Sequence, residues 1–159
     1  MNKNVILILL WVLFAILVRL TPHPPNFTPM VALALFFAHT IKRKWLTYLI
    51  PLSAIIISDI VLGFYWINLW VYLGFALVTL IGQFNKLKPT TILASSTTFF
   101  IVTNLGVFLS GGYGYTLSGL TTCYVMAIPF FINMLVGDFF FSYIWKYSYK
   151  FTTDRLINA

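Results

Sequence analysis

The sequence predicts an all-α, polytopic membrane protein in which six transmembrane helices form a bundle. Hydrophobic residues make up 60% of the chain and charged residues only 8%, whereas an ordinary soluble domain has about 25% charged residues. Apolar runs of roughly 20 residues, the length that crosses a bilayer, recur along the sequence. These runs lack the alternation of polar and apolar residues that is typical of a membrane β-barrel. Helices are therefore the predicted elements.

Six apolar runs divide the chain, and short polar or turn-forming segments separate them. The helices are predicted at about residues 4–20, 27–41, 45–62, 67–82, 90–109 and 120–145. The segments between them are Pro-rich at 21–26, basic at 42–44, aromatic at 63–66, polar at 83–89 and Gly-rich at 110–119. Residues 1–159 are thus expected to form a single integral membrane domain, with no room for a separate soluble catalytic domain.

The first two runs need separate arguments. The first follows Lys3 as a signal peptide would, but Arg19 and Pro22 stand where a small-residue cleavage site is required, so we expect a retained helix. The second run is short. It is apolar all round from Val31 to Ala38, and Pro29 suits the first turn of a helix.

The basic residues predict the orientation, because they accumulate on the cytoplasmic side of membrane proteins. With six crossings, nine of the ten Lys and Arg residues share the side of both termini, which are therefore predicted to be cytoplasmic. Only Arg19 lies outside. The count would be the same if 27–41 did not cross and the N-terminus lay outside. The positions of the basic residues thus do not decide whether residues 27–41 cross the membrane.

Polar and aromatic side chains from separate segments fall at one depth, near the outer surface. Carboxylate, imidazole, amide and phenol groups against apolar walls are the usual make-up of a small-molecule site. A polar side chain within a spanning segment is a functional candidate because its burial is costly. The predicted ligand-binding residues are His23, Asn26, Asp59, Trp66, Asn104, Tyr113 and Tyr115.

Each candidate also has a structural interpretation. Asp59 and Asn104 can serve only as hydrogen-bonding groups between helices. Trp66 and Tyr113 can belong to an aromatic belt at the membrane surface. The sequence does not decide between these roles.

Three further residues are predicted to contact a partner protein. Ala34 and Ala38 have the small-x-x-x-small spacing that permits close helix contacts. Asp138 lies in the cytoplasmic half of the last helix, apart from the outer polar groups. Buried charges are usually paired, so the favoured partner of Asp138 within the chain is Lys42 or Lys146.

Several classes of chemistry lack the residues they need. The only histidines, His23 and His39, lie on opposite sides, and so do Asp59 and Asp138, so no catalytic residues and no enzyme activity are predicted. No Gly-rich phosphate loop is present, and no cofactor is predicted. The lone Cys123 forms neither a disulfide nor a metal site. The net charge of +7 is explained by orientation and contact with anionic lipid rather than by nucleic acid.

Short motifs resemble a family of small bacterial inner-membrane proteins of unknown function. The resemblance rests on PHPPNFTP at 22–29, ALALF at 32–36, SDIVLG at 58–63, FFIVTN at 99–104, GLTTCY at 119–124 and IPFFIN at 128–133. It implies a multi-pass protein of the bacterial inner membrane.

The layout is also similar to the substrate-binding S components of energy-coupling factor transporters. Those are six-helix bundles that bind a vitamin or trace nutrient from the outer side, while an ATP-driven module supplies energy. The resemblance implies a small-molecule ligand for this chain, an energising ATPase and transmembrane module as partner, and the Pro-rich loop as a lid. The docking motif of that family lies on its first helix, whereas Ala34 and Ala38 lie on the second here. The alternative is a structural or assembly subunit of a larger membrane complex, without a ligand.

Overall fold

The computed structural model describes the backbone of residues 3–157 and the side chains of residues 5–151, and this part of the chain forms helices without strands. The side chains of Lys3 and Arg155, which were used for the orientation, lie outside these ranges. The helices are α1 (Lys3–Leu20), α2 (Met30–Thr40), α3 (Lys44–Leu62), α4 (Asn68–Phe84), α5 (Pro89–Leu109) and α6 (Leu117–Ile157). The prediction of an all-α protein is confirmed.

Three of the helices are long and apolar enough to cross a membrane. They are α3, α5 and the Leu117–Phe151 part of α6, whereas α1, α2 and α4 are apolar but shorter. Large apolar side chains also cover the outside: Ile60, Val61 and Leu117 are each at least two-thirds exposed. Lipid is the solvent in which such a surface is stable. These features indicate a membrane protein.

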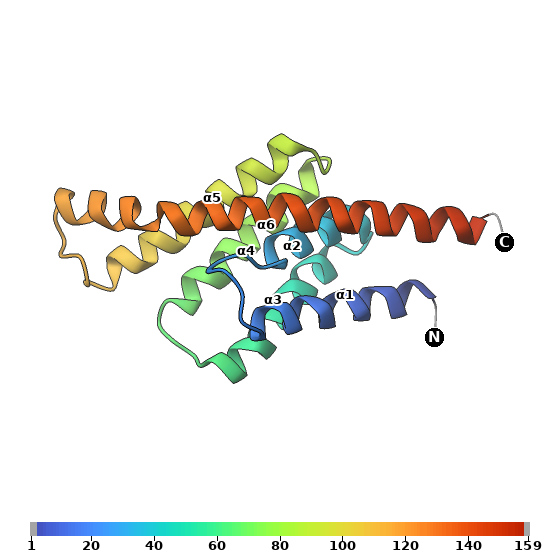
Figure 1. Ribbon diagram of the computed structural model, residues 1–159, viewed down its shortest axis with the longest axis horizontal. Coiled ribbons are helices and arrows are strands. Elements are labelled where there is room, and N and C mark those ends of the chain that lie inside the picture. The colour runs from blue at the N-terminus through green and yellow to red at the C-terminus, as the bar shows by residue number, and fades with distance from the viewer. Residues whose placement is uncertain (1–2, 158–159) are drawn as a thin grey trace.

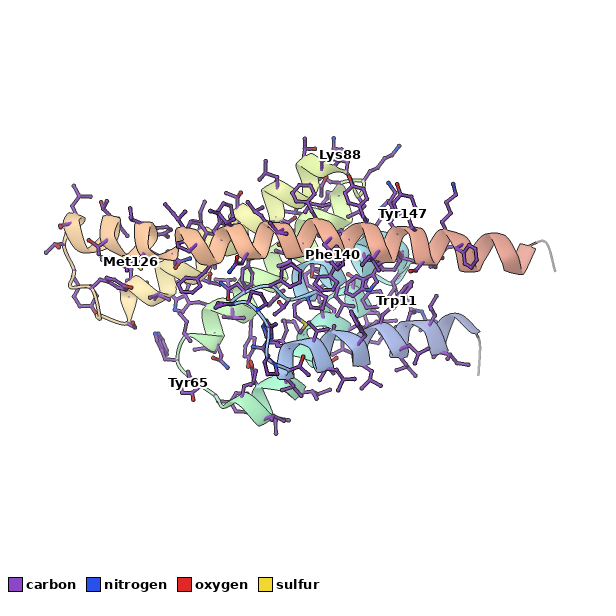
Figure 2. The ribbon with its side chains drawn as sticks, viewed as in Figure 1. Trp11, Tyr65, Lys88, Met126, Phe140 and Tyr147 are labelled. Carbon is purple, nitrogen blue, oxygen red and sulfur yellow. The ribbon has the colours of Figure 1, made fainter. Side chains whose placement is uncertain are left out.

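Successive helices run in alternating directions, as Figure 1 shows. The first turn of α1 and the last turn of α6 lie at one end of the molecule, and the segments that follow α1, α3 and α5 lie toward the other. Lys88 immediately precedes α5 and points away from the bundle (Figure 2).

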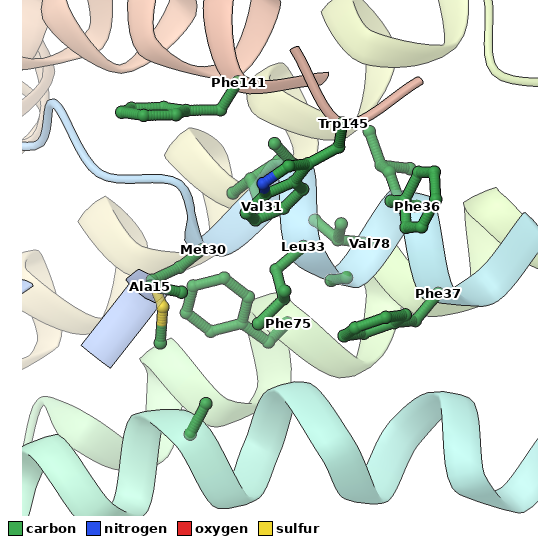
Figure 3. Close-up of a cluster of buried hydrophobic side chains, with 14 of the residues drawn as sticks. Ala15, Met30, Val31, Leu33, Phe36, Phe37, Phe75, Val78, Phe141 and Trp145 are labelled. Atoms are coloured by element: carbon green, nitrogen blue, oxygen red, sulfur yellow. The ribbon is translucent and has the colours of Figure 1, made fainter. Parts of the chain in front are cut away.

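Helix α2 forms the centre of the bundle. Every residue from Met30 to Ala38 is buried, because α2 packs against α3, α4 and α6 and touches α1 and α5. Its apolar residues all round the helix are what a helix enclosed on every side requires. Figure 3 shows its side chains among those of α1, α4 and α6, with Trp145 beside Phe36.

The predicted second helix is longer than the observed one. Residues 27–29 are not helical, and α2 has 11 residues, which at 1.5 Å per residue make about 17 Å. A bilayer core is about 30 Å thick, so this helix alone does not reach across it. Pro29 explains the late start, because proline has no N–H to donate within a helix and occupies a first turn readily.

The last helix, in contrast, is longer than predicted. It was expected at 120–145, but α6 has 41 residues and continues through Pro129 to Ile157. The apolar run ends at Trp145, which is buried beside Trp11 of α1. Lys and Arg favour helices, so a loss of hydropathy does not end the helix there.

Candidate functional site

A cavity of about 650 Å³ lies among α4, α5, α6 and the segment between α1 and α2. Small-molecule sites commonly have volumes of about 300–1,000 Å³. The cavity is lined by Arg19, His23, Pro25, Asn26, Thr28, Met30, Val31, Leu62, Val71, Phe75, Phe99, Phe100, Thr103, Asn104, Val107, Tyr113, Cys123, Met126, Ala127, Phe130, Met134 and Asp138. Its walls are therefore mainly apolar and aromatic, with a few separated polar groups.

Two helices supply the long sides of the cavity. The lining residues of α6 recur every three or four positions from Cys123 to Asp138, so they share one face of that helix. Those of α5 recur in the same way from Phe99 to Val107. Met126, which Figure 2 labels, belongs to the α6 face. Because α5 and α6 run in opposite directions, Phe99 and Asp138 lie at the same end of the cavity, the end farther from the segment at 110–116 that joins the two helices.

Non-helical backbone forms another wall. Pro25, Asn26 and Thr28 line the cavity in the segment that precedes α2. Asn26 adopts a positive φ of 64°, a conformation that Asn tolerates better than most residues. The Asn133 amide donates a 3.1 Å hydrogen bond to the Pro25 carbonyl, and the Phe27 ring packs on that of Phe141, so α6 anchors the segment.

A charged cluster stands beside the cavity, with Asp59 at its centre. Asp59 is 2% exposed, and its Oδ1 lies 2.6 Å from Nη1 of Arg19. Oδ2 accepts hydrogen bonds from the Asn68 amide at 3.0 Å and from the Tyr72 hydroxyl at 2.7 Å. Arg19 also donates to the hydroxyl of Ser58. Both charges are thus neutralised within the fold.

Asp138 has different surroundings from those expected. It is fully buried, and the one ion pair among the described side chains joins Arg19 to Asp59. The expected pairing with Lys42 or Lys146 is therefore wrong. Asp138 faces α5 instead, where its Oδ2 lies 2.6 Å from the Ser96 hydroxyl, while its Oδ1 has no hydrogen-bond partner. Lys146 lies over the Tyr143 ring. Asp138 thus borders the cavity that the outer polar groups line.

Four of the seven predicted ligand-binding residues line the cavity: His23, Asn26, Asn104 and Tyr113. The other three do not appear in its wall as the structure describes it. Asp59 is linked to the wall through Arg19, whereas Trp66 and Tyr115 are 62% and 71% exposed. Both aromatic residues lie in the segments between helices, and neither is among the lining residues of the cavity.

The small residues of α2 lie inside the bundle. Ala34 has no exposed surface and Ala38 is 9% exposed. A Cβ placed on Gly82 of α4 would lie 2.8 Å from the Ala38 Cβ, so glycine permits this close approach. In the structure these residues serve contacts within the chain.

Sequence reasoning missed three features of the site. Arg19 was used only to orient the chain, although an arginine within an apolar run is itself a signal of a polar partner. Asn68 and Tyr72 are four residues apart, the spacing that places two side chains on one helix face, and both meet Asp59. Met134 and Phe99 carry no such signal, because apolar residues line cavities and cores alike.

Two polar side chains of the cavity wall have groups that a ligand could contact. His23 is exposed enough to contact a ligand, and its Nδ1 lies 2.6 Å from the Thr21 carbonyl. The Asn104 amide donates to the Phe100 carbonyl at 2.8 Å, which leaves its own carbonyl oxygen available as an acceptor. The described side chains contain no group of three His, Cys, Asp or Glu residues that could hold a metal ion.

Comparison with curated proteins and with solved structures finds no match. One family, in contrast, matches residues 1–158, nearly the whole length of the sequence. On this match the chain belongs to the Family of unknown function (DUF6580).

Proposed function

We propose that this protein is a membrane-embedded binding subunit for the uptake of a small molecule, such as a vitamin or trace metabolite. The observation that carries the proposal is the cavity of about 650 Å³, in which separated polar groups stand against aromatic walls. A packed bundle that served only as a scaffold would have no need of such a volume, since protein interiors are close-packed.

The broken second crossing supports the same proposal. Within a bilayer, non-helical backbone is stable only where protein buries it or where it lines a water-filled cavity. In this segment Pro25, Asn26 and Thr28 line the cavity and Pro29 is buried, and the Asn133 amide of α6 holds the Pro25 carbonyl. In membrane transporters, interrupted helices commonly form the substrate site. Here the non-helical segment and α2 together would make the second crossing.

The proposed topology has six crossings, with both termini in the cytoplasm and the cavity in the extracytoplasmic half. The alternating helix directions and the basic segments at 42–44 and 86–88 support it. This proposed layout resembles that of an S component of an energy-coupling factor transporter, and an ATPase and transmembrane module would then supply the energy.

Ligand binding is tested on the protein purified in mild detergent. Native mass spectrometry should detect a co-purifying small molecule, and one member of a vitamin panel should raise the melting temperature, because a ligand that binds only the folded state stabilises it. His23→Ala and Asn104→Ala should lower retention. Tyr115→Ala, which changes an exposed side chain outside the cavity wall, is the matched control.

Failure of these measurements would favour the assembly role. That outcome is a protein without any bound small molecule whose melting temperature no panel member changes, and which co-purifies with subunits of a respiratory or secretion complex.

The sidedness has its own test. In a Cys123→Ser background, single cysteines in place of Tyr115 and Lys88 should react with an impermeant maleimide from opposite sides of the membrane. Labelling of both from the same side would contradict the topology.

A further inference from the structure

Asp138 is the one carboxylate among the described residues that line the cavity, and its hydrogen-bond geometry suits a protonated group. The Ser96 hydroxyl lies 3.0 Å from the Ile92 carbonyl and 2.6 Å from Asp138 Oδ2. A hydroxyl has one hydrogen to donate. One hydrogen can be shared between the two acceptors, but each contact has a hydrogen of its own when Ser96 donates to Ile92 and Asp138 carries the hydrogen that it donates to Ser96. In this arrangement Asp138 is a neutral carboxylic acid.

The second oxygen of Asp138 is an acceptor without a donor. Oδ1 is buried and unpartnered, and so is the hydroxyl of Ser142, one turn further along α6. Most helical hydroxyl groups in this chain satisfy themselves on a carbonyl of the preceding turn, as those of Thr79 and Thr103 do. A buried acceptor left open costs free energy, so an open acceptor at the end of a cavity is suited to a ligand donor.

The cationic side chains of residues 5–151 do not supply that donor. Arg19 is the cation of the cavity wall, and its contacts are to α3, chiefly to Asp59. Lys44 lies over the Phe84 ring, and Lys146 lies over the Tyr143 ring. None of the cations in the described part of the chain pairs with Asp138, so its open oxygen is left for a cation that a ligand supplies.

The walls near Asp138 suit such a cation. Phe75, Phe99, Phe100 and Phe130 line the cavity, and aromatic faces attract organic cations. Met134 is one turn before Asp138 on the same face of α6 and is 4% exposed. Its unbranched side chain changes rotamer easily, which gives a ligand a route to the buried carboxyl group.

We propose that the ligand carries a basic amine and that Asp138 is the residue that binds it. This inference rests on the proposed binding function and names the chemical class of its ligand. When a neutral amine binds, its nitrogen takes the Asp138 proton: an N–H bond forms, the O–H bond breaks, and an ammonium–carboxylate pair results. When the amine arrives as an ammonium ion, the Asp138 proton passes to solvent instead.

The test compares probes that differ only in their polar group. Phenyl, indolyl and cyclohexyl ethyl skeletons are each supplied as amine, alcohol and carboxylate, and their dissociation constants for the purified full-length protein are measured by calorimetry. A charged hydrogen bond contributes about 1.5–3 kcal/mol, so the best amine should bind about 10- to 100-fold more tightly than its alcohol. Asp138→Asn should remove this preference, whereas Thr79→Val, an isosteric change of a buried side chain outside the cavity wall, should retain it.

A second readout needs only the wild-type protein. At neutral pH the amine probes are protonated, so titrations in buffers of different ionisation enthalpy should show about one proton released per amine bound and none per alcohol. Asp138→Asn, if it folds, should abolish the release. The wild-type measurement keeps the test decisive even if that variant does not fold.

Three results would overturn the inference. They are equal or tighter binding of the alcohols or carboxylates, amine binding without proton release, and a co-purifying ligand that has no basic nitrogen. In each of these cases the binding function itself would stand. A protein that retains no small molecule of any kind would instead contradict the proposed function.

Discussion

The two buried aspartates differ in how completely the chain satisfies them. Asp59 has an arginine, an amide and a phenol as partners, whereas Asp138 has one serine and an open oxygen. The first carboxylate holds α1, α3 and α4 together and is already neutralised. The second lies at the end of a cavity and is left to interact with something else. A buried carboxyl group with all its partners indicates a structural role, whereas the open oxygen of Asp138 supports the proposed binding role.

Asp59→Asn should give the largest loss of stability. The change leaves the Arg19 guanidinium without its counter-ion, and breaking a buried ion pair from one side typically costs about 3–5 kcal/mol. The free energy of unfolding is measured by titration with a denaturing detergent. The double variant Arg19→Met with Asp59→Asn is the control and should recover much of the loss. A single variant as stable as wild type would remove the contrast between the two aspartates.

Tyr72→Phe tests the same cluster through a smaller change. Its hydroxyl donates to a charged carboxylate, and such a bond contributes about 1.5–3 kcal/mol. Tyr124→Phe is matched to it, because that hydroxyl donates at the same 2.7 Å to the neutral Ile101 carbonyl, which is worth about 0.5–1.5 kcal/mol. Equal losses in the two variants would mean that Asp59 is not ionised.

Asn133→Ala examines the contact that anchors the cavity wall. It removes one neutral hydrogen bond to Pro25, so stability should fall by about 0.5–1.5 kcal/mol. This hydrogen bond anchors the non-helical segment to α6, so its loss should lower ligand retention as well. Loss of stability without loss of retention would separate this segment from the site.

Asp138→Asn should change stability least, by less than about 1 kcal/mol, because one neutral polar group replaces another of the same shape. Its effect is expected on amine binding instead. Unfolding is measured in the same detergent titration as for Asp59→Asn. A loss as large as that of Asp59→Asn would assign Asp138 a structural role.

Much of the fold could be predicted because helix formation in an apolar chain follows local composition. The six helical segments and the turn at 63–66 are visible in hydropathy alone, and the structure has a helix in each. Hydropathy does not distinguish a crossing helix from an enclosed one, so α2 was predicted too long. It also does not register the end of a helix that leaves the apolar region, so α6 was predicted too short.

The candidate site was predictable only in part. His23, Asn26, Asn104 and Tyr113 line the cavity, whereas Trp66 and Tyr115 do not, because sequence position does not determine the direction of a side chain. Asp138 and Asp59 were assigned to a protein partner and a ligand, respectively. The structure places Asp138 at the cavity and surrounds Asp59 with residues from three helices, because rotation about a helix axis is set by packing between distant segments. A single sequence does not contain that information.

The central position of α2 has a consequence for biosynthesis. The residues that enclose it belong mostly to α3, α4 and α6, all of which are made later. At 11 residues, α2 is too short to be stable as a separate membrane-spanning helix before α3, α4 and α6 have been made. Its docking must therefore follow the insertion of its neighbours, so the native bundle is completed only after the last helix has left the ribosome.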